Sequence, residues 1–153
     1  MGAIRDVQPA SSSLQLAELT ADNVVEACRI KVKQGQERFV APVAESLAEA
    51  YVHRETAWPR LILDDGRVVG FVMGNFDPEN EISAFRAGIW RLNVQDLEQG
   101  RGYGRFAVAA VADEARRRGQ VDLRTAPGST RGGHRLLRRG QPWGLVRGGQ
   151  DHL

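Results

Sequence analysis

The sequence predicts an α+β domain in which helices flank one mixed, mainly antiparallel sheet. Three observations predict this class. The apolar pattern gives the order strand, two helices, three strands and a helix. An Asp-Gly turn separates two apolar runs, which is a strong signal for a β-hairpin. A glycine-rich turn then lies between a strand and a segment of good helix formers. A chain of 153 residues is one domain of ordinary size.

The first half of the chain predicts one strand and two helices. Residues 14–19 alternate apolar and polar side chains, as a half-buried strand does. Thr20 is the expected N-cap of a helix over residues 21–32, where apolar residues recur at helical spacing. A second helix is expected over residues 43–53, directly after Pro42.

The second half of the chain predicts a hairpin, a further strand and a helix. The hairpin strands are expected at residues 61–63 and 67–73, on either side of the Asp-Asp-Gly turn at 64–66. A polar loop then leads into a strand over residues 84–94. The last predicted element is an Ala/Val/Arg helix over residues 106–118.

The composition predicts a single soluble domain in a reducing compartment. The net charge is +2, and the only cysteine, Cys28, excludes an intramolecular disulfide framework. We expect Cys28 to be a buried structural thiol on the first helix. Residues 1–13, with a proline and a serine run, are expected to be a disordered lead-in. No secretory or membrane-spanning pattern is present, so a cytoplasmic location is expected.

The stretch from Gln99 to Arg105 has the clearest chemical meaning. It reads Gln-Gly-Arg-Gly-Tyr-Gly-Arg and opens the last helix. A helix start presents free backbone N–H groups and the positive end of the helix dipole, so an anion such as a pyrophosphate is the expected guest. The glycines lack the Cβ atoms that would keep an anion from the backbone. The pattern is neither a P-loop nor the Rossmann fingerprint, and a glycine-rich surface turn is the alternative.

These residues resemble the Gln/Arg-x-x-Gly-x-Gly/Ala signature of the GNAT superfamily of N-acetyltransferases, here Gln99-x-x-Gly102-x-Gly104. The resemblance implies a GNAT-like fold whose loop holds the pyrophosphate of the co-substrate acetyl-CoA. The cofactor-binding residues that it implies are Leu92, Asn93, Val94, Gln99, Gly100, Arg101, Gly102, Tyr103, Gly104 and Arg105.

Shorter stretches at residues 36–41, 46–51 and 69–73 resemble bacterial spermine/spermidine (diamine) N-acetyltransferases. This implies acetyl transfer to a primary amine of a small polyamine such as spermidine or spermine. Two alternatives stay open: an acetyltransferase of another amine, on an antibiotic or a protein, and a non-catalytic acetyl-CoA-binding remnant. The expected partner is a small amine, with no nucleic acid and no membrane, and a homodimer is left open.

The chemistry of such a transfer assigns further roles. A backbone N–H at Asn93 or Val94 is the expected donor to the oxyanion, whereas no residue is marked by spacing as the catalytic base. A polyamine site needs carboxylates, and Glu37 is the substrate-binding candidate together with Phe39 and Trp90, whose alternative role is core packing. Further carboxylates that could contribute are Glu45, Glu49, Glu79 and Glu81. No metal is expected, because the three histidines, His53, His134 and His152, lack ligand spacing.

The end of the chain departs from the resemblance. Residues 121–125 can supply a fifth strand, so the acetyl-CoA-binding domain is expected to span residues 14–125. Residues 126–153 form an atypical Arg/Gly-rich tail with seven glycines and no isoleucine, phenylalanine or tyrosine, so the closing strands are expected to be atypical or missing. The tyrosine that the resemblance implies as the acid for the leaving thiolate would fall at Leu137.

Two explanations of this tail are open. One is an out-of-frame reading of GC-rich coding DNA or a degenerated C-terminus, and the other is a lineage-specific tail that closes the sheet differently. A family-like tail encoded in a shifted frame of the gene would support the first explanation. An intact frame with no such tail in either shifted frame would exclude it.

Overall fold

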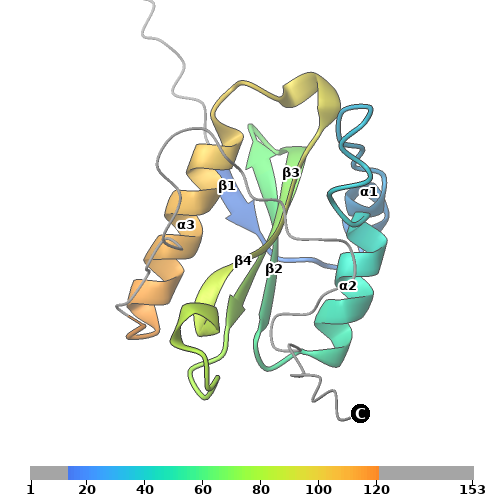
Figure 1. Ribbon diagram of the computed structural model, residues 1–153. Helices are drawn as coiled ribbons and strands as arrows, with labels where there is room; N and C mark the ends of the chain where they lie inside the picture. Colours follow the sequence, from blue (N-terminus) through green and yellow to red (C-terminus); the bar gives the residue numbers. More distant parts are fainter. Residues whose placement is uncertain (1–13, 121–153) are drawn as a thin grey trace, which may run out of the picture.

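The sheet is the centre of the fold. The computed structural model describes residues 14–120, and within them four strands form one antiparallel sheet in the order β1-β2-β3-β4 (Figure 1). The strands are β1 (Leu14–Ala17), β2 (Ala57–Asp64), β3 (Arg67–Phe76) and β4 (Ala87–Val94). This arrangement confirms the α+β class. The expected fifth strand at 121–125 lies outside the described residues, as does the tail.

Helices cover both faces of this sheet. The helices α1 (Val24–Cys28) and α2 (Val43–Val52) pack on one face, and α3 (Tyr103–Arg117) packs on the other (Figure 1). Two short 3-10 helices, η1 (Ser83–Phe85) and η2 (Asp96–Glu98), lie before and after β4. Residues 14–120 therefore form three layers, with a hydrophobic core on each side of the sheet.

The two cores follow from the alternation of side chains along the strands. Leu61 and Ile62 are neighbours on β2, yet Leu61 belongs to the core under α1 and α2 whereas Ile62 belongs to the core under α3. On β3, Phe71 and Met73 face α1 and α2, and Val72 between them faces α3. Both faces are buried, which explains why these strands read as continuous apolar runs.

The expected first helix is wrong in its length. It was predicted over residues 21–32, but α1 spans only Val24–Cys28, with Asn23 rather than Thr20 as its N-cap. The Asn23 Oδ1 atom accepts a hydrogen bond from the Thr20 backbone N–H at 2.8 Å, which stabilises a turn before the helix. After the helix, the backbone of Lys31 bonds to the segment beyond β4 instead of continuing the helical ladder.

The environment of Cys28 also differs from the prediction. The thiol side chain is exposed rather than buried. The short α1 turns Ala27 into the core, and Ile30 just beyond the helix is also buried. Side chains of adjacent helical residues point about 100° apart. Because Ala27 faces the core, the next residue, Cys28, points away from it.

The remaining elements agree with the sequence and differ at their ends. The second helix ends at Val52, with His53 as its C-cap, and the last helix begins at Tyr103 rather than at residue 106. The strand expected over 84–94 begins at Ala87, because η1 occupies the preceding residues. Both hairpin strands are longer than expected.

A β-bulge changes the direction of side chains on β4. Met73 pairs with Arg91 and Gly74 pairs with Ile89, so Trp90 is the extra residue of β4. Ile89 packs in the α3 core whereas Trp90 packs in the core under α1 and α2. The Arg91 side chain also points to the α2 face, where it meets α2 in an ion pair. The bulge therefore places two consecutive large side chains on one face.

The substitution Gly70→Ala should destabilise the protein by about 2 kcal/mol, since overpacked sites typically lose this much. A Cβ atom at Gly70 would lie 2.8 Å from the Asn93 backbone O and 3.1 Å from Ile62 Cδ1. Urea unfolding measures the change. The control Gly88→Ala, whose Cβ would meet no atom within 4 Å, should change stability by less than about 0.5 kcal/mol. Equal stability of the two variants would contradict the close approach of β3 and β4.

Candidate active site

The loop between β4 and α3 has a backbone that only glycine adopts easily. Gly100 has φ 83° and Gly102 has φ 89°, both in the left-handed region, and Gly102 is the N-cap of α3. A Cβ atom at either position would meet no heavy atom within 4 Å. Backbone conformation rather than crowding therefore requires glycine here, and the surface at these residues is accessible to a ligand.

The start of α3 presents backbone donors. The first hydrogen bond of the helix runs from the Phe106 N–H to the Gly102 O at 3.0 Å. The N–H groups of Tyr103, Gly104 and Arg105 therefore have no acceptor within the helix. A Cβ atom at Gly104 would have Leu92 Cδ2 as its nearest neighbour at 3.8 Å, so the backbone is accessible there too. These residues fit the oxygens of a diphosphate.

The charged side chains of the loop are not equivalent. The Nη1 atom of Arg101 lies 3.2 Å from Glu98 Oε2, and Arg67 donates to the other oxygen of the same carboxylate at 3.2 Å. The charge of Arg101 is thus partly balanced by Glu98. Arg105 is exposed and has no ion pair within residues 14–120. Of the two predicted arginines, Arg105 is the better available partner for an anion.

Tyr103 fixes the start of α3 to the sheet. Its side chain is only 3% exposed, and its hydroxyl donates to Asp64 Oδ2 at 2.5 Å. The hydrogen bond to the Asp64 carboxylate, together with burial, raises the pKa of the Tyr103 phenol above its usual value, against a weaker opposing effect of Arg101. The phenol therefore stays neutral and is already engaged with Asp64. Of the groups of Tyr103, only the backbone N–H is therefore available to bind a diphosphate.

Gln99, the first residue of the motif, links three segments. Its Nε2 atom donates to the Val94 backbone O at 3.1 Å and to Gln36 Oε1 at 2.9 Å. In return, Gln36 Nε2 donates to Gln99 Oε1 at 3.4 Å. The glycine loop is thereby held against the end of β4 and against the connection between α1 and α2. Sequence reasoning missed Gln36, because nothing near it in the chain marks a partner 63 residues away.

We call residues 31–41, most of the connection between α1 and α2, the strap. Its first residue is fixed by two bonds, from the Lys31 N–H to Gln95 Oε1 at 2.8 Å and from the Asp96 N–H to the Lys31 O at 2.8 Å. Its last residue is fixed by Asn93 Nδ2, which donates to the Ala41 O at 3.0 Å. The strap thus lies along the end of β4 and beside η2, at the upper right of Figure 1.

The structure separates the three predicted substrate residues. Glu37 and Phe39 lie on the strap, where Phe39 is 46% exposed and Glu37 Oε2 accepts from the Gly35 N–H at 2.6 Å. Trp90 is only 5% exposed, and its ring packs at a tilt against that of His53, with the ring centroids 5.5 Å apart. Trp90 therefore has the core-packing role that was its alternative. Glu37 and Phe39 stay candidates for contact with a substrate.

One of the predicted carboxylates is already used. Arg91 is 8% exposed, and its Nη2 atom donates to Glu49 Oε2 at 2.9 Å. A buried guanidinium requires such a partner, so Glu49 is a structural residue here. The carboxylates of Glu45, Glu79 and Glu81 are exposed.

The direction of the peptide groups distinguishes the two candidate oxyanion donors. The Gln95 N–H donates to β3, at the Val69 O, over 2.9 Å. In a strand the N–H and C=O of one residue point to the same edge and those of the next residue to the opposite edge. The N–H and C=O of Asn93 therefore also face β3, and the Asn93 carbonyl O indeed lies against Gly70. The N–H and C=O of Val94 face the opposite edge of β4, which no other strand within residues 14–120 covers. The geometry therefore favours Val94 over Asn93 as the donor.

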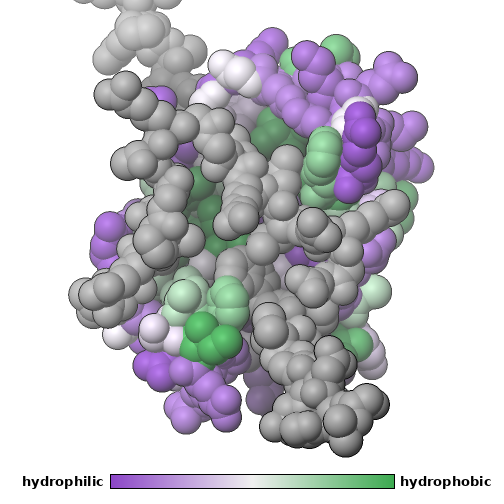
Figure 2. Space-filling model, in the orientation of Figure 1, coloured by the Kyte–Doolittle hydropathy of each residue, from purple (hydrophilic) through white to green (hydrophobic). Residues whose placement is uncertain are grey.

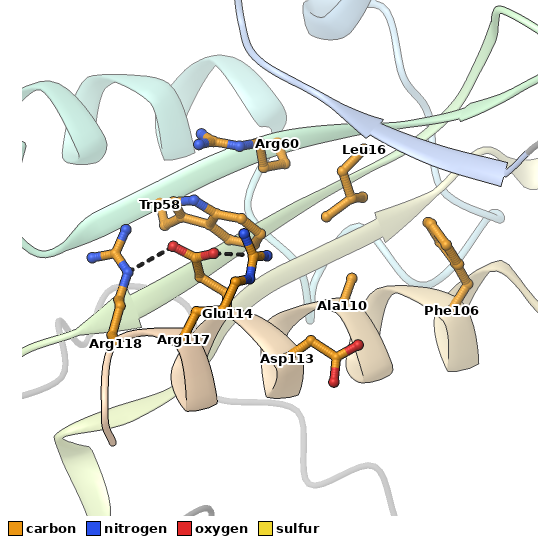
Figure 3. A pocket seen from close by; sticks show the side chains of 9 residues that line it. All are labelled: Leu16, Trp58, Arg60, Phe106, Ala110, Asp113, Glu114, Arg117 and Arg118. Carbon is orange, nitrogen blue, oxygen red and sulfur yellow. Dashed lines mark hydrogen bonds and ion pairs between the residues drawn. The ribbon is translucent and has the colours of Figure 1, made fainter. Parts of the chain in front are cut away.

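A pocket of about 470 Å³ lies in another part of the molecule, between α3 and the β1–β2 side of the sheet (Figure 3). Trp58 and Arg60 of β2 line it, with the Arg60 guanidinium 4.5 Å from the Trp58 ring centroid. Opposite them, Glu114 forms ion pairs with Arg117 and Arg118, both at 2.8 Å. No residue predicted from the sequence for the cofactor or the substrate lines this pocket.

Two further observations concern residues 14–120 only. They bring together no group of three His, Cys, Asp or Glu side chains that could hold a metal ion. None of their helices has the length and apolarity that crossing a membrane requires. The predicted tyrosine position at Leu137 and the histidines at 134 and 152 lie outside the described residues.

Comparison with known proteins shows that the chain matches the model of one protein family. A family model described as the acetyltransferase (GNAT) family matches residues 24–140. The match contains every element from α1 to α3 together with the glycine loop, and it continues past Gln120 into the segment where we expect a departure. No curated protein matches the chain.

The substitution Tyr103→Phe should lower the free energy of unfolding by about 2 kcal/mol at neutral pH, because a buried hydrogen bond to a carboxylate is lost. The raised pKa of Tyr103 means that this contribution is complete below about pH 10, the phenol pKa of the unfolded chain, and is lost as the pH rises through the folded-state value. The difference between variant and wild type should therefore shrink in alkaline urea unfolding series. The control Tyr51→Phe alters a side chain that is 71% exposed and should be neutral at every pH. A constant difference for Tyr103→Phe would refute the role of the phenol.

Proposed function

The chain belongs to the GNAT family of acetyltransferases, and we propose that it acetylates a primary amine of a small polyamine such as spermidine or spermine. The family uses acetyl-CoA as co-substrate, which makes the chain an acetyl-CoA-dependent N-acetyltransferase in general terms. One observation carries the assignment to this site: a glycine loop with free donors at the start of α3, directly beside the end of β4. The identity of the acceptor is the finer part of the proposal.

For the cofactor, we assign the diphosphate to the N–H groups at the start of α3 and to the Arg105 guanidinium. Leu92 and Val94 lie on either side of Asn93 in the strand, so their N–H and C=O groups point to the edge of β4 away from β3. These groups would hold the remainder of the acetyl-CoA molecule along that edge. Gln99 acts indirectly, because its amide fixes the loop to the Val94 carbonyl.

Bound acetyl-CoA supplies an activated acetyl group, and the chain must stabilise the charge that develops on its carbonyl oxygen. The Val94 N–H is the donor that we assign to this oxygen. The amine, whose pKa in solution is about 10.4, must arrive neutral or lose a proton at the site. The acid that the family places on its terminal helix would be at Leu137, which cannot donate a proton. A non-catalytic acetyl-CoA-binding remnant is therefore one alternative.

The polyamine proposal is supported by exposed carboxylates near the strap. Glu37 lies on the strap and Glu45 lies on the first turn of α2, and both are exposed. Such groups attract a polycation over distances of several ångströms and raise its rate of association. Phe39, two residues after Glu37 and exposed, offers apolar area to the alkyl part of the acceptor.

The charge of the strap itself favours a second candidate. Lys31, Lys33 and Arg38 outnumber Glu37 on it, and the Arg38 guanidinium lies 5.3 Å from the Phe39 ring centroid. Figure 2 shows mostly hydrophilic side chains over this part of the surface, at its upper right. A positive strap suits an amine that stands beside carboxylates, such as a protein amine in an acidic segment.

The expected cytoplasmic location and the homodimer remain predictions.

Acetyl-CoA should stabilise the wild-type chain by about 2.7 kcal/mol at a concentration of 100 Kd, measured as a rise in melting temperature. Gly102→Val and Gly104→Val should abolish this rise, because a branched side chain blocks the approach of the diphosphate to the backbone. The control Gly119→Val matches Gly102 in its positive φ of 73° and its lack of neighbours, but lies at the other end of α3. It should lose basal stability and keep the rise. No rise for the wild type at millimolar acetyl-CoA would remove the cofactor assignment.

Spermidine and spermine should be acetylated with a higher kcat/KM than butylamine, and added salt should reduce this preference, because screening acts over about 8 Å at physiological ionic strength. Thiol release from acetyl-CoA measures the rate. Glu37→Gln should lower kcat/KM for spermidine severalfold, whereas Glu26→Gln, an exposed carboxylate on α1, should not.

Each other outcome of this panel selects an alternative. Equal, salt-independent rates for butylamine and spermidine would exclude the polyamine. Faster acetylation of a peptide amine flanked by acidic residues would support the second candidate. Binding of acetyl-CoA without thiol release for any amine would support the remnant.

A further inference from the structure

We propose that Gln36 is a positioning residue that couples acetyl-CoA binding at the glycine loop to the acceptor side of the site. The link is its reciprocal amide pair with Gln99. This inference rests on the proposed function, since it assumes that the glycine loop binds acetyl-CoA and that the strap contacts the amine. It adds a route by which one site influences the other.

The amide pair joins two segments that have little regular structure of their own. The glycine loop contains two left-handed glycines, at which a Cβ atom would meet nothing within 4 Å. The strap contains only turns between α1 and α2. Segments of this kind take their positions from a few specific contacts, and they are drawn from the less stable part of a fold. The Gln36–Gln99 pair is such a contact for both.

Gln36 lies at the point of the strap that carries the candidate substrate residues. Its backbone carbonyl accepts from the Phe39 N–H at 2.8 Å and from the Val40 N–H at 3.2 Å, which closes a turn around Glu37 and Phe39. The same residue reaches Gln99 with its side chain. A displacement of Gln36 therefore moves the whole turn, including both exposed candidate side chains.

The ends of the strap are fixed to residues that precede the glycine loop in the chain. Lys31 is bonded to Gln95 and Asp96, and Ala41 is bonded to Asn93, so these anchors lie on β4, on η2 and on Gln95, the N-cap of η2. The middle of the strap is different, because Gln36 bonds to Gln99 within the glycine motif itself. A change in the order of the glycine loop can therefore reach the turn at 36–40 directly, through the Gln36–Gln99 pair.

The physical consequence is positive coupling between the two substrates. A diphosphate that orders the glycine loop also fixes the Gln99 amide and, through it, the turn on the strap. By linkage, the acceptor must then raise the affinity for CoA by the same factor. One neutral amide pair accounts for a factor of about five, at the lower end of typical couplings.

Hydrogen exchange tests the link, with and without CoA as the probe. In the ligand-free protein, Gln36→Met removes the amide at nearly equal volume and should speed exchange in both segments, 36–40 and 99–105. In the wild type, CoA should slow exchange in both segments, whereas in Gln36→Met it should slow only the glycine loop. The control Gln34→Ala changes an exposed glutamine of the same strap and should behave as the wild type.

The effect of spermidine on the affinity for CoA provides a second test, because a residue with a merely structural role would not change it. In the wild type, saturating spermidine should tighten CoA binding about fivefold, and in Gln36→Met this factor should fall to about one. Gln36→Glu should retain part of the coupling, because a carboxylate still accepts from Gln99 Nε2, the shorter of the two bonds.

The outcomes separate the link from the proposed function. If CoA changes neither the exchange of the wild-type loop nor its melting temperature, the proposed function fails and the inference fails with it. If CoA protects the loop and leaves the strap unchanged, or if Gln36→Met keeps the full coupling, the inference alone is overturned. Faster exchange confined to the strap in ligand-free Gln36→Met also overturns it.

Discussion

The burial of β3 on every side is the constraint on which the rest of the structure depends. Residues 69–76 are all buried, with β2 and β4 on the two edges and helices over both faces. A strand in this position needs apolar side chains in both directions, so it requires a cover on each face of the sheet. The helices α1 and α2 supply one cover and α3 supplies the other.

The location of the candidate site follows from this constraint. The chain leaves β4 on the face of α1 and α2 at η2 and must return to the opposite face to begin α3. The glycine loop makes this crossing, which explains its two left-handed residues and its exposure at the edge of the sheet. The position of the candidate anion site at the start of α3 is thus a result of how the chain covers β3.

Local signals predicted the elements that depend on local interactions. The Asp-Gly hairpin is an example, because Asp65 has φ 49° and Gly66 has φ 80°, the two positive values that a tight two-residue hairpin turn requires. The glycine loop is another, since its residues define the turn and the helix start themselves. The order of the elements could be predicted for the same reason.

Long-range interactions decided the features that the sequence did not reveal. The helix expected over 21–32 ends early because Lys31 bonds to residues more than 60 positions away. Trp90 lies in the core because a bulge shifts the register of β4, and register depends on the partner strand. Gln36 and Gln95 are ordinary polar residues until their distant partners are known. The hydrophobic periodicities of helices and strands, 3.6 and two residues, contain no information about such long-range contacts.

The balance of charge around the glycine loop indicates how it would recognise a ligand. Glu98 pairs with both Arg67 and Arg101, so an acidic side chain stands beside the expected anion site and reduces its net positive charge. Exposed guanidinium groups are also screened by salt over about 8 Å at physiological ionic strength. The N–H groups of Tyr103 to Arg105 keep fixed directions at any ionic strength, because the buried Tyr103 anchors the first turn of α3 to Asp64. Recognition at this loop must therefore depend more on the arrangement of the ligand's oxygens than on its total charge.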